Sequence, residues 1–84
     1  MIVEDFRGNK VGVVKIIGGK LYIDTNNQKL KNLLANAQIL DFFSGVEKDS
    51  EFVTLSNKVG IKDSDYLDAL SSYLGNNNFI LILT

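Results

Sequence analysis

The densest group of potentially reactive side chains is the cluster Asp63, Asp65 and Asp68, whose carboxylates could together bind a divalent cation. A calcium-binding EF-hand loop needs a glycine at its sixth position and a glutamate at its twelfth. Counted from Asp63, those positions hold Asp68 and Leu74, so the chain does not match this loop. Carboxylates are also favourable in the first turn of a helix, next to the positive end of the helix dipole. We therefore interpret the cluster as the start of a helix and predict no metal site.

The chain contains neither histidine nor cysteine, which removes most of the familiar catalytic chemistry. Without histidine there is no common general base near neutral pH and no Ser-His-Asp triad. Without cysteine there is no thiolate nucleophile, no disulfide and no zinc or iron–sulfur site built on thiolates. The segment Gly18-Gly19-Lys20 lacks the G-x-x-x-x-G-K-[ST] spacing of a phosphate-binding loop. We predict no catalytic residues, no cofactor and no enzymatic activity.

A second type of chemistry is the binding of nucleic acid through basic and aromatic side chains, for which the candidates are Lys10, Lys15, Lys20 and Tyr22. Residues 1–31 hold six basic and three acidic side chains, a net charge of +3, whereas residues 32–84 have a net charge of −4. An aromatic ring beside lysines can hold single-stranded nucleic acid by stacking and phosphate contact. The whole chain has a net charge of −1, however, whereas nucleic-acid-binding domains usually have a clear basic excess. Nucleic-acid binding is therefore the alternative hypothesis.

The composition is that of one soluble globular domain, with 84 residues, 45% of them hydrophobic and 23% charged. The longest apolar run, residues 79–83, is far shorter than the roughly 20 residues of a membrane-spanning helix. The first five residues, Met1 to Asp5, end in two acids and do not resemble a signal peptide. We expect a single domain over residues 1–84, located in the cytoplasm and not associated with a membrane.

The clearest local signal is a β-hairpin at Gly18-Gly19, because two glycines can adopt the positive φ angles of a two-residue type I′ turn. The predicted register pairs Ile17–Lys20, Ile16–Leu21, Lys15–Tyr22 and Val14–Ile23. One face of the hairpin is then apolar and carries Val14, Ile16, Leu21 and Ile23. The other face is mixed and carries Val13, Lys15, Ile17, Lys20, Tyr22 and Asp24. A further turn at residues 7–10 predicts another strand over residues 2–6, although adjacent acids at 4 and 5 interrupt its alternation.

Helical spacing follows the hairpin, after the N-cap candidates Thr25-Asn26-Asn27. The apolar positions Leu30, Leu33, Leu34 and Ala37 predict a helix through about Ala37. Residues 38–43 either continue this helix to a stop at Gly45 or form a short buried strand. Residues 51–56 read as a strand, and a second helix begins at Asp63 and ends at Gly75.

The C-terminal segment, residues 79–83, is apolar on both faces, which is typical of a strand in the centre of a sheet. Together these elements predict an α+β fold in two layers. We expect an antiparallel or mixed sheet, formed by the N-terminal hairpin and a central C-terminal strand, with two helices on one face.

Two helices can cover only one face of this sheet, so the apolar residues of the second face need another explanation. A loop at residues 44–50 could cover that face, or scattered exposed apolar residues could be tolerated. The remaining explanation is a protein partner, and two-fold homodimers are the commonest oligomers. The candidate interaction residues are Val13, Ile17, Tyr22, Phe42 and Phe43. We predict a non-enzymatic interaction or assembly module that binds a second copy of itself or another protein.

Overall fold

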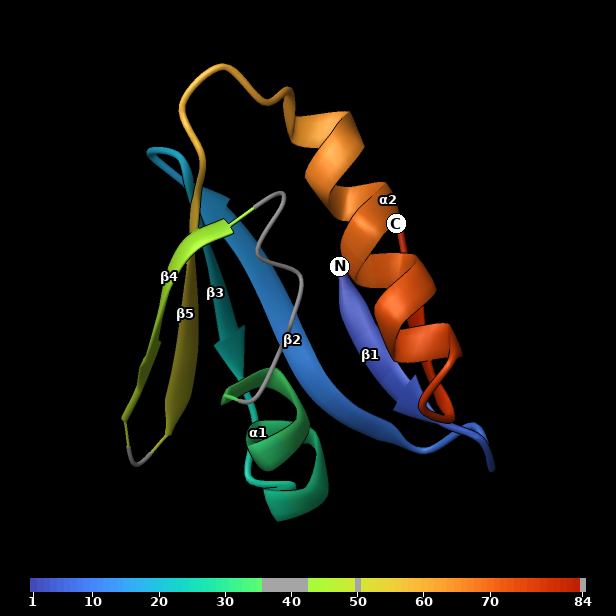
Figure 1. Ribbon diagram of the computed structural model, residues 1–84. Helices are drawn as coiled ribbons and strands as arrows, with labels where there is room; N and C mark the ends of the chain where they lie inside the picture. Colours follow the sequence, from blue (N-terminus) through green and yellow to red (C-terminus); the bar gives the residue numbers. More distant parts are fainter. Residues whose placement is uncertain (36–42, 50, 84) are drawn as a thin grey trace.

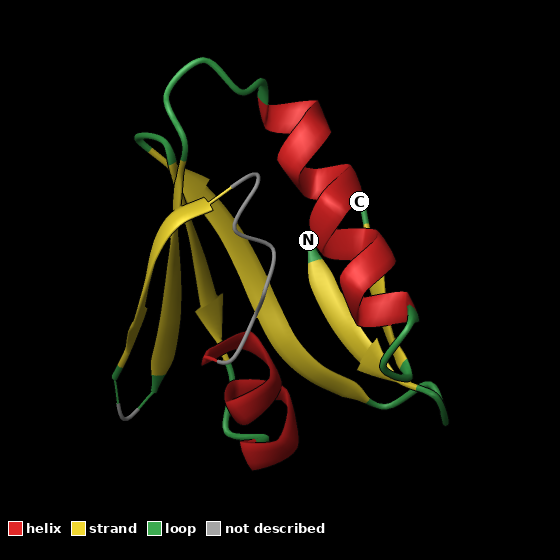
Figure 2. Ribbon diagram, viewed as in Figure 1, coloured by secondary structure: helices red, strands yellow, loops and turns green. Residues whose placement is uncertain are grey.

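The computed structural model describes residues 1–35, 43–49 and 51–83 (Figure 1). Within these ranges the chain forms six strands and two helices: β1 (Ile2–Asp5), β2 (Lys10–Ile17), β3 (Lys20–Asp24), α1 (Gln28–Ala35), β4 (Phe43–Lys48), β5 (Phe52–Asn57), α2 (Asp63–Gly75) and β6 (Phe79–Ile82). These strands form one sheet in the order β4-β5-β3-β2-β1-β6, and neighbouring strands are antiparallel. Both helices lie on the same side of the sheet (Figure 2). The α+β fold in two layers, with two helices on one face, is confirmed.

The β2–β3 hairpin has the register that its sequence predicts. The pairs on either side of the turn are Ile17–Lys20, Ile16–Leu21, Lys15–Tyr22 and Val14–Ile23. Gly18 and Gly19 both have positive φ angles, 55° and 77°, as the two-residue turn requires. Val14, Leu21 and Ile23 are at most 2% exposed and belong to the core, so the predicted apolar face is the one that packs under the helices.

The predicted N-terminal strand is also present, as β1, which pairs with β2 and ends at Asp5. The Asp5 carboxylate accepts hydrogen bonds from the backbone N–H groups of Arg7 and Asn9, each 2.9 Å long, and from the Asn9 side chain. These hydrogen bonds, that of the Asn9 backbone first, lower the pKa of Asp5 below its ordinary value. Two adjacent acids are tolerated because the register shifts between Val3 and Glu4, and because Asp5 organises the turn.

Helix α1 begins where the cap candidates predict. The Asn27 side-chain oxygen accepts a hydrogen bond of 2.9 Å from the Leu30 N–H, so Asn27 caps the helix. The Thr25 hydroxyl accepts the Asn27 N–H at 3.0 Å and donates to the Val11 carbonyl. These contacts tie the start of α1 to strand β2. Leu30 and Leu34 are at most 1% exposed beneath the helix.

Helix α2 completes the helical layer, with Tyr66, Leu70 and Leu74 buried against the sheet. The Tyr66 ring packs at an angle against Phe43, with 6.0 Å between ring centroids. The Tyr73 hydroxyl donates a 2.9 Å hydrogen bond to the Leu33 carbonyl and so joins the two helices.

The prediction that the C-terminal strand is central in the sheet is wrong. Among the strands that the structure describes, β6 pairs with β1 alone and lies at the edge of the sheet, beside α2 (Figure 1). Phe79 and Leu81 point to the core, where they are 3% and 7% exposed, whereas Ile80 is 52% exposed on the opposite side. The strand is apolar on both faces because both sides of this sheet carry apolar residues, so a strand at the edge has the same pattern as a central one.

The segment left open between helix and strand, residues 38–43, falls mostly on residues 36–42, which lie outside the described residues. Its last residue, Phe43, begins β4, and Gly45 lies inside that strand instead of following a helix. Residues 44–48 therefore do not form a loop over the second face. They pair with β5 and extend the sheet as its other edge strand.

Candidate functional site: the open face of the sheet

The side of the sheet that faces away from both helices carries every second residue of the strands, because side chains alternate between the two faces. We call this side the open face. By register it comprises Ile2, Glu4, Lys10, Val13, Lys15, Ile17, Lys20, Tyr22, Asp24, Glu47, Phe52, Thr54, Ser56, Ile80 and Ile82. Neither α1 nor α2 packs on it (Figures 1 and 2).

The apolar side chains of the open face come from strands across most of the sheet. Ile2 is the Cα partner of both Ile82 and Val13, so three aliphatic side chains from β6, β1 and β2 lie in one row. Ile17 is 59% exposed and Phe52 is 37% exposed, from β2 and β5 respectively. A sheet face that stays in water is usually lined by polar residues. The open face therefore has more apolar surface than a solvated sheet face needs.

Tyr22 occupies the middle of this face. Its cross-strand partners are Lys15 on β2 and Thr54 on β5, and its neighbours on β3 are Lys20 and Asp24. Directly opposite residues in an antiparallel pair have their Cβ atoms about 5 Å apart. The tyrosine ring is thus surrounded by one cationic and one hydroxyl-bearing side chain across the strands, and by opposite charges along its own strand.

The charges on the open face are balanced. The basic residues are Lys15 and Lys20, with Lys10 opposite Glu4 at the far end of β2, and the acidic residues are Glu4, Asp24 and Glu47. Three positive and three negative side chains leave no net charge. Such a surface can face another surface of the same kind without overall repulsion.

Comparisons of this chain with protein-family models, curated proteins and solved structures find no match. No helix among residues 1–35, 43–49 and 51–83 is long and apolar enough to cross a membrane. The function must therefore be inferred from the residues of the open face.

The structure brings three of the five interaction candidates together. Val13, Ile17 and Tyr22 all lie on the open face of the β2–β3 hairpin. Phe43 is 2% exposed and packs against Tyr66 in the core, so it is not available at the surface of a single chain. Phe42 lies outside the described residues.

The lysines proposed for nucleic-acid binding are spread along the hairpin. Lys15 is directly opposite Tyr22, and Lys20 is two residues from Tyr22 on β3. Lys10 is far from Lys20 along the hairpin. Lys20 pairs with Ile17, and Ile17 is seven residues from Lys10, a separation of roughly 20 Å along strand β2. Acidic side chains lie between them, so the four residues do not form one continuous basic patch.

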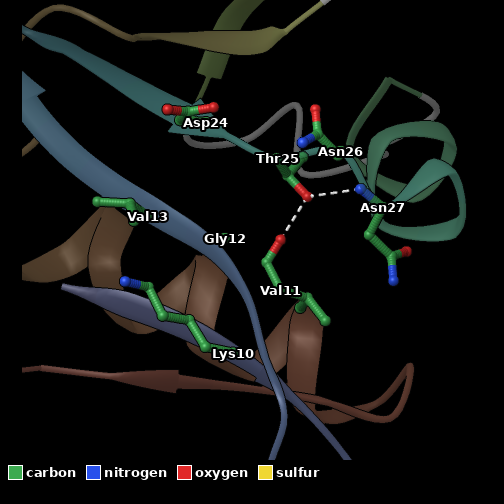
Figure 3. Close-up of a pocket in the computed structure, with 8 residues that line it drawn as sticks. All are labelled: Lys10, Val11, Gly12, Val13, Asp24, Thr25, Asn26 and Asn27. Carbon is green, nitrogen blue, oxygen red and sulfur yellow. Dashed lines mark hydrogen bonds between the residues drawn. The ribbon is translucent and has the colours of Figure 1, made fainter.

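A depression of about 480 Å³ lies where β2 and β3 separate beyond the Val13–Asp24 pair (Figure 3). Figure 3 shows the Thr25 hydroxyl between the Val11 carbonyl and the Asn27 N–H, with both hydrogen bonds drawn. Because Thr25 is 3% exposed and already bonded on both sides, its hydroxyl has no free role towards a ligand. The polar groups of this depression therefore join strand β2 to the start of helix α1, and we do not assign it a ligand.

A second depression, of about 420 Å³, lies between the Gly18-Gly19 turn and the start of α2. It contains Lys20 and Lys58, but Asp63 occupies the first turn of the helix and accepts a hydrogen bond from the Tyr66 hydroxyl. As predicted, the acidic cluster begins α2, with Asp63 and Asp65 in the first turn of the helix. Among the described residues, no group of three carboxylates is placed to hold a metal ion.

Four apolar members of the open face were not predicted from the sequence: Ile2, Ile80, Ile82 and Phe52. The C-terminal isoleucines were assigned to a central strand, where they would be covered. The sequence does contain a signal for the isoleucines. In β1 and β6 apolar residues stand at both odd and even positions, so each strand places apolar side chains on both faces of the sheet.

Proposed function

We propose that this chain is a small, non-enzymatic assembly module that pairs with a second copy of itself through the open face. The observation that carries this proposal is the set of apolar and aromatic side chains on the face opposite the helices, namely Ile2, Val13, Ile17, Tyr22, Phe52, Ile80 and Ile82. Two sheets that pack face to face bury such side chains between them, about 10 Å apart.

A second copy is the simplest partner for this face. A two-fold axis places the same surface on both sides of the interface, so the apolar side chains of one copy are covered by the open face of the other. The balanced charge of the open face supports this arrangement, because two copies carry no net repulsion. Burial of the face also adds to the modest core of a domain of this size. The location we propose is the cytoplasm, where small domains fold without disulfides.

The proposal is tested by the mass of the protein in solution, measured for matched variants. Ile17→Ser removes an exposed apolar side chain from the open face, and Val59→Ser removes one from the loop before α2, where Val59 is 103% exposed. We expect Ile17→Ser to weaken the dimer about tenfold and Val59→Ser to leave it unchanged. Equal effects of the two substitutions would show that the open face is not the interface.

The second candidate function is nucleic-acid binding, which rests on the direct pairing of Lys15 with Tyr22. Stacking on the ring and contact of the lysine with phosphate are the expected interactions. The affinity for a single-stranded oligonucleotide would then fall steeply with salt and be lost in Tyr22→Ser. Absence of binding at low salt removes this candidate.

A further inference from the structure

The outward residues of β3 have a pattern that is complementary to itself. Lys20, Tyr22 and Asp24 follow one another at every second position, so a positive, an aromatic and a negative side chain point to the open face in that order. Lys20 and Asp24 are both exposed, and within the described part of the chain neither has an ion-pair partner. Each is therefore free to pair with a charge on another molecule.

This pattern matches a second copy of itself when the two copies are related by a two-fold axis at Tyr22. The axis lies in the plane of the interface and runs perpendicular to the strands. It lays β3 antiparallel to β3 of the second copy and exchanges the positions of residues 20 and 24. Lys20 then lies over the second copy's Asp24, and Asp24 over its Lys20. The two Tyr22 rings meet on the axis.

Strand β2 fits the same axis. Its outward residues are Val13, Lys15 and Ile17, with Lys15 opposite Tyr22 and therefore on the axis. The axis exchanges residues 13 and 17, so Ile17 lies over the second copy's Val13. Lys15 approaches its own copy on this axis, and so does Glu47, which lies in the same row opposite Thr54. These two like-charge contacts are unfavourable, whereas the two Lys20–Asp24 pairs are favourable.

Two axes that run along the strands match the charges less well. An axis along β3 sets Lys20 against Lys20 and Asp24 against Asp24. An axis along the strands but between β2 and β3 sets Asp24 against the apolar Val13, with Tyr22 against Lys15. Opposed like charges and a carboxylate buried against an aliphatic side chain both oppose association.

The separation of packed sheets suits these pairs. Two sheets lie about 10 Å apart and rotated by about 30°. The four-carbon stem of a lysine on one sheet and the shorter aspartate on the other can span this gap at a position two residues from the axis.

We infer that the second copy docks on the open face about a two-fold axis at Tyr22, with reciprocal Lys20–Asp24 pairs between the copies. This inference rests on the proposed function, because it specifies the geometry of the same dimer.

The test is the dimer dissociation constant of charge-reversal variants, measured by sedimentation equilibrium on the full chain. Lys20→Asp and Asp24→Lys each turn two attractions into two repulsions and are expected to raise the dissociation constant about tenfold. The double variant restores both pairs with reversed sign and is expected to return within about threefold of the unmodified protein. Since both side chains are exposed, thermal unfolding serves to verify that every variant is folded.

Lys15→Met is expected to strengthen the dimer, whereas the two charge reversals weaken it. This substitution removes the repulsion between the two Lys15 side chains on the axis and should lower the dissociation constant by about threefold. If the axis lies between β2 and β3, Tyr22 contacts Lys15 of the second copy, and Lys15→Met weakens the dimer. That result would overturn the axis at Tyr22.

The outcomes separate this inference from the proposed function. A monomer at every concentration overturns both. A dimer that is indifferent to the single reversals, or a double variant that stays weak, overturns the axis at Tyr22 while the dimer itself stands. Rescue by the double variant supports the inference.

Discussion

Ile2 and Val13 are directly opposite each other on β1 and β2, on the side of the sheet that neither helix covers. Ile82 on β6 is the next residue in the same row. On the other side of the same strands, Val3 and Val14 are at most 2% exposed under the helices. The sheet thus has two apolar sides, and within the described residues the helices cover only one. This arrangement is the physical basis of the proposed self-association.

The two sides of the β2–β3 hairpin should respond differently to loss of a side chain. Leu21→Ala leaves a cavity in the core, where Leu21 is 0% exposed, and should lower the free energy of unfolding by about 3 kcal/mol. Ile17→Ala, at a residue that is 59% exposed, should change it by less than about 1 kcal/mol under conditions where the chain is monomeric. Urea unfolding at low protein concentration measures both, and similar losses would contradict the assigned faces.

Thr25 should be important for the attachment of α1 to the sheet. Thr25→Val keeps the shape of the side chain but leaves the Val11 carbonyl and the Asn27 N–H without this partner. We expect a loss of about 2 kcal/mol in the free energy of unfolding. Thr25→Ser retains the hydroxyl and serves as the control, with a smaller loss. If the serine variant is the less stable of the two, the hydroxyl does not have this role.

Stability at alkaline pH should depend on Tyr66. Burial, and then the hydrogen bond to Asp63, raise the pKa of Tyr66 above its ordinary value of 10.0. The folded chain therefore holds this proton more tightly than the unfolded chain does. The resulting stability is complete below pH 10.0 and is lost as the pH rises from there through the folded pKa.

Thermal unfolding between about pH 9 and about pH 11 tests this dependence. Tyr66→Phe loses one hydrogen bond, worth about 1 kcal/mol at neutral pH, but should lose less stability than the unmodified chain on going to alkaline pH. The same alkaline loss in both proteins would exclude Tyr66 as the source.

The parts of the fold that the sequence predicted well are those with a local geometric constraint. The Gly18-Gly19 turn fixes the register of β2 against β3, because a one-residue slip would move every side chain to the opposite face. Helix α1 is marked by its cap at Asn27, and α2 by the acids that begin it at Asp63. These signals depend on residues close together in the chain.

The parts that were missed depend on residues far apart in the chain. β6 was placed at the centre because the sequence shows apolar residues on both faces and not which strands lie beside it. β4 was missed because Ser44, Gly45 and Glu47 dilute its apolar pattern, and its register shifts between Phe43 and Gly45. The same limit applies to the open face, since Ile2 and Ile82 come from opposite ends of the chain and meet only in the sheet.

Sedimentation equilibrium over a range of protein concentrations measures whether the open face joins two copies of this chain. We expect the apparent mass to rise with concentration from the 9.3 kDa of one chain towards twice that value. We also expect Tyr22→Ser, in the middle of the open face, to shift this rise to higher concentration. An apparent mass of 9.3 kDa at every concentration up to the high micromolar range would show that the open face does not join two copies.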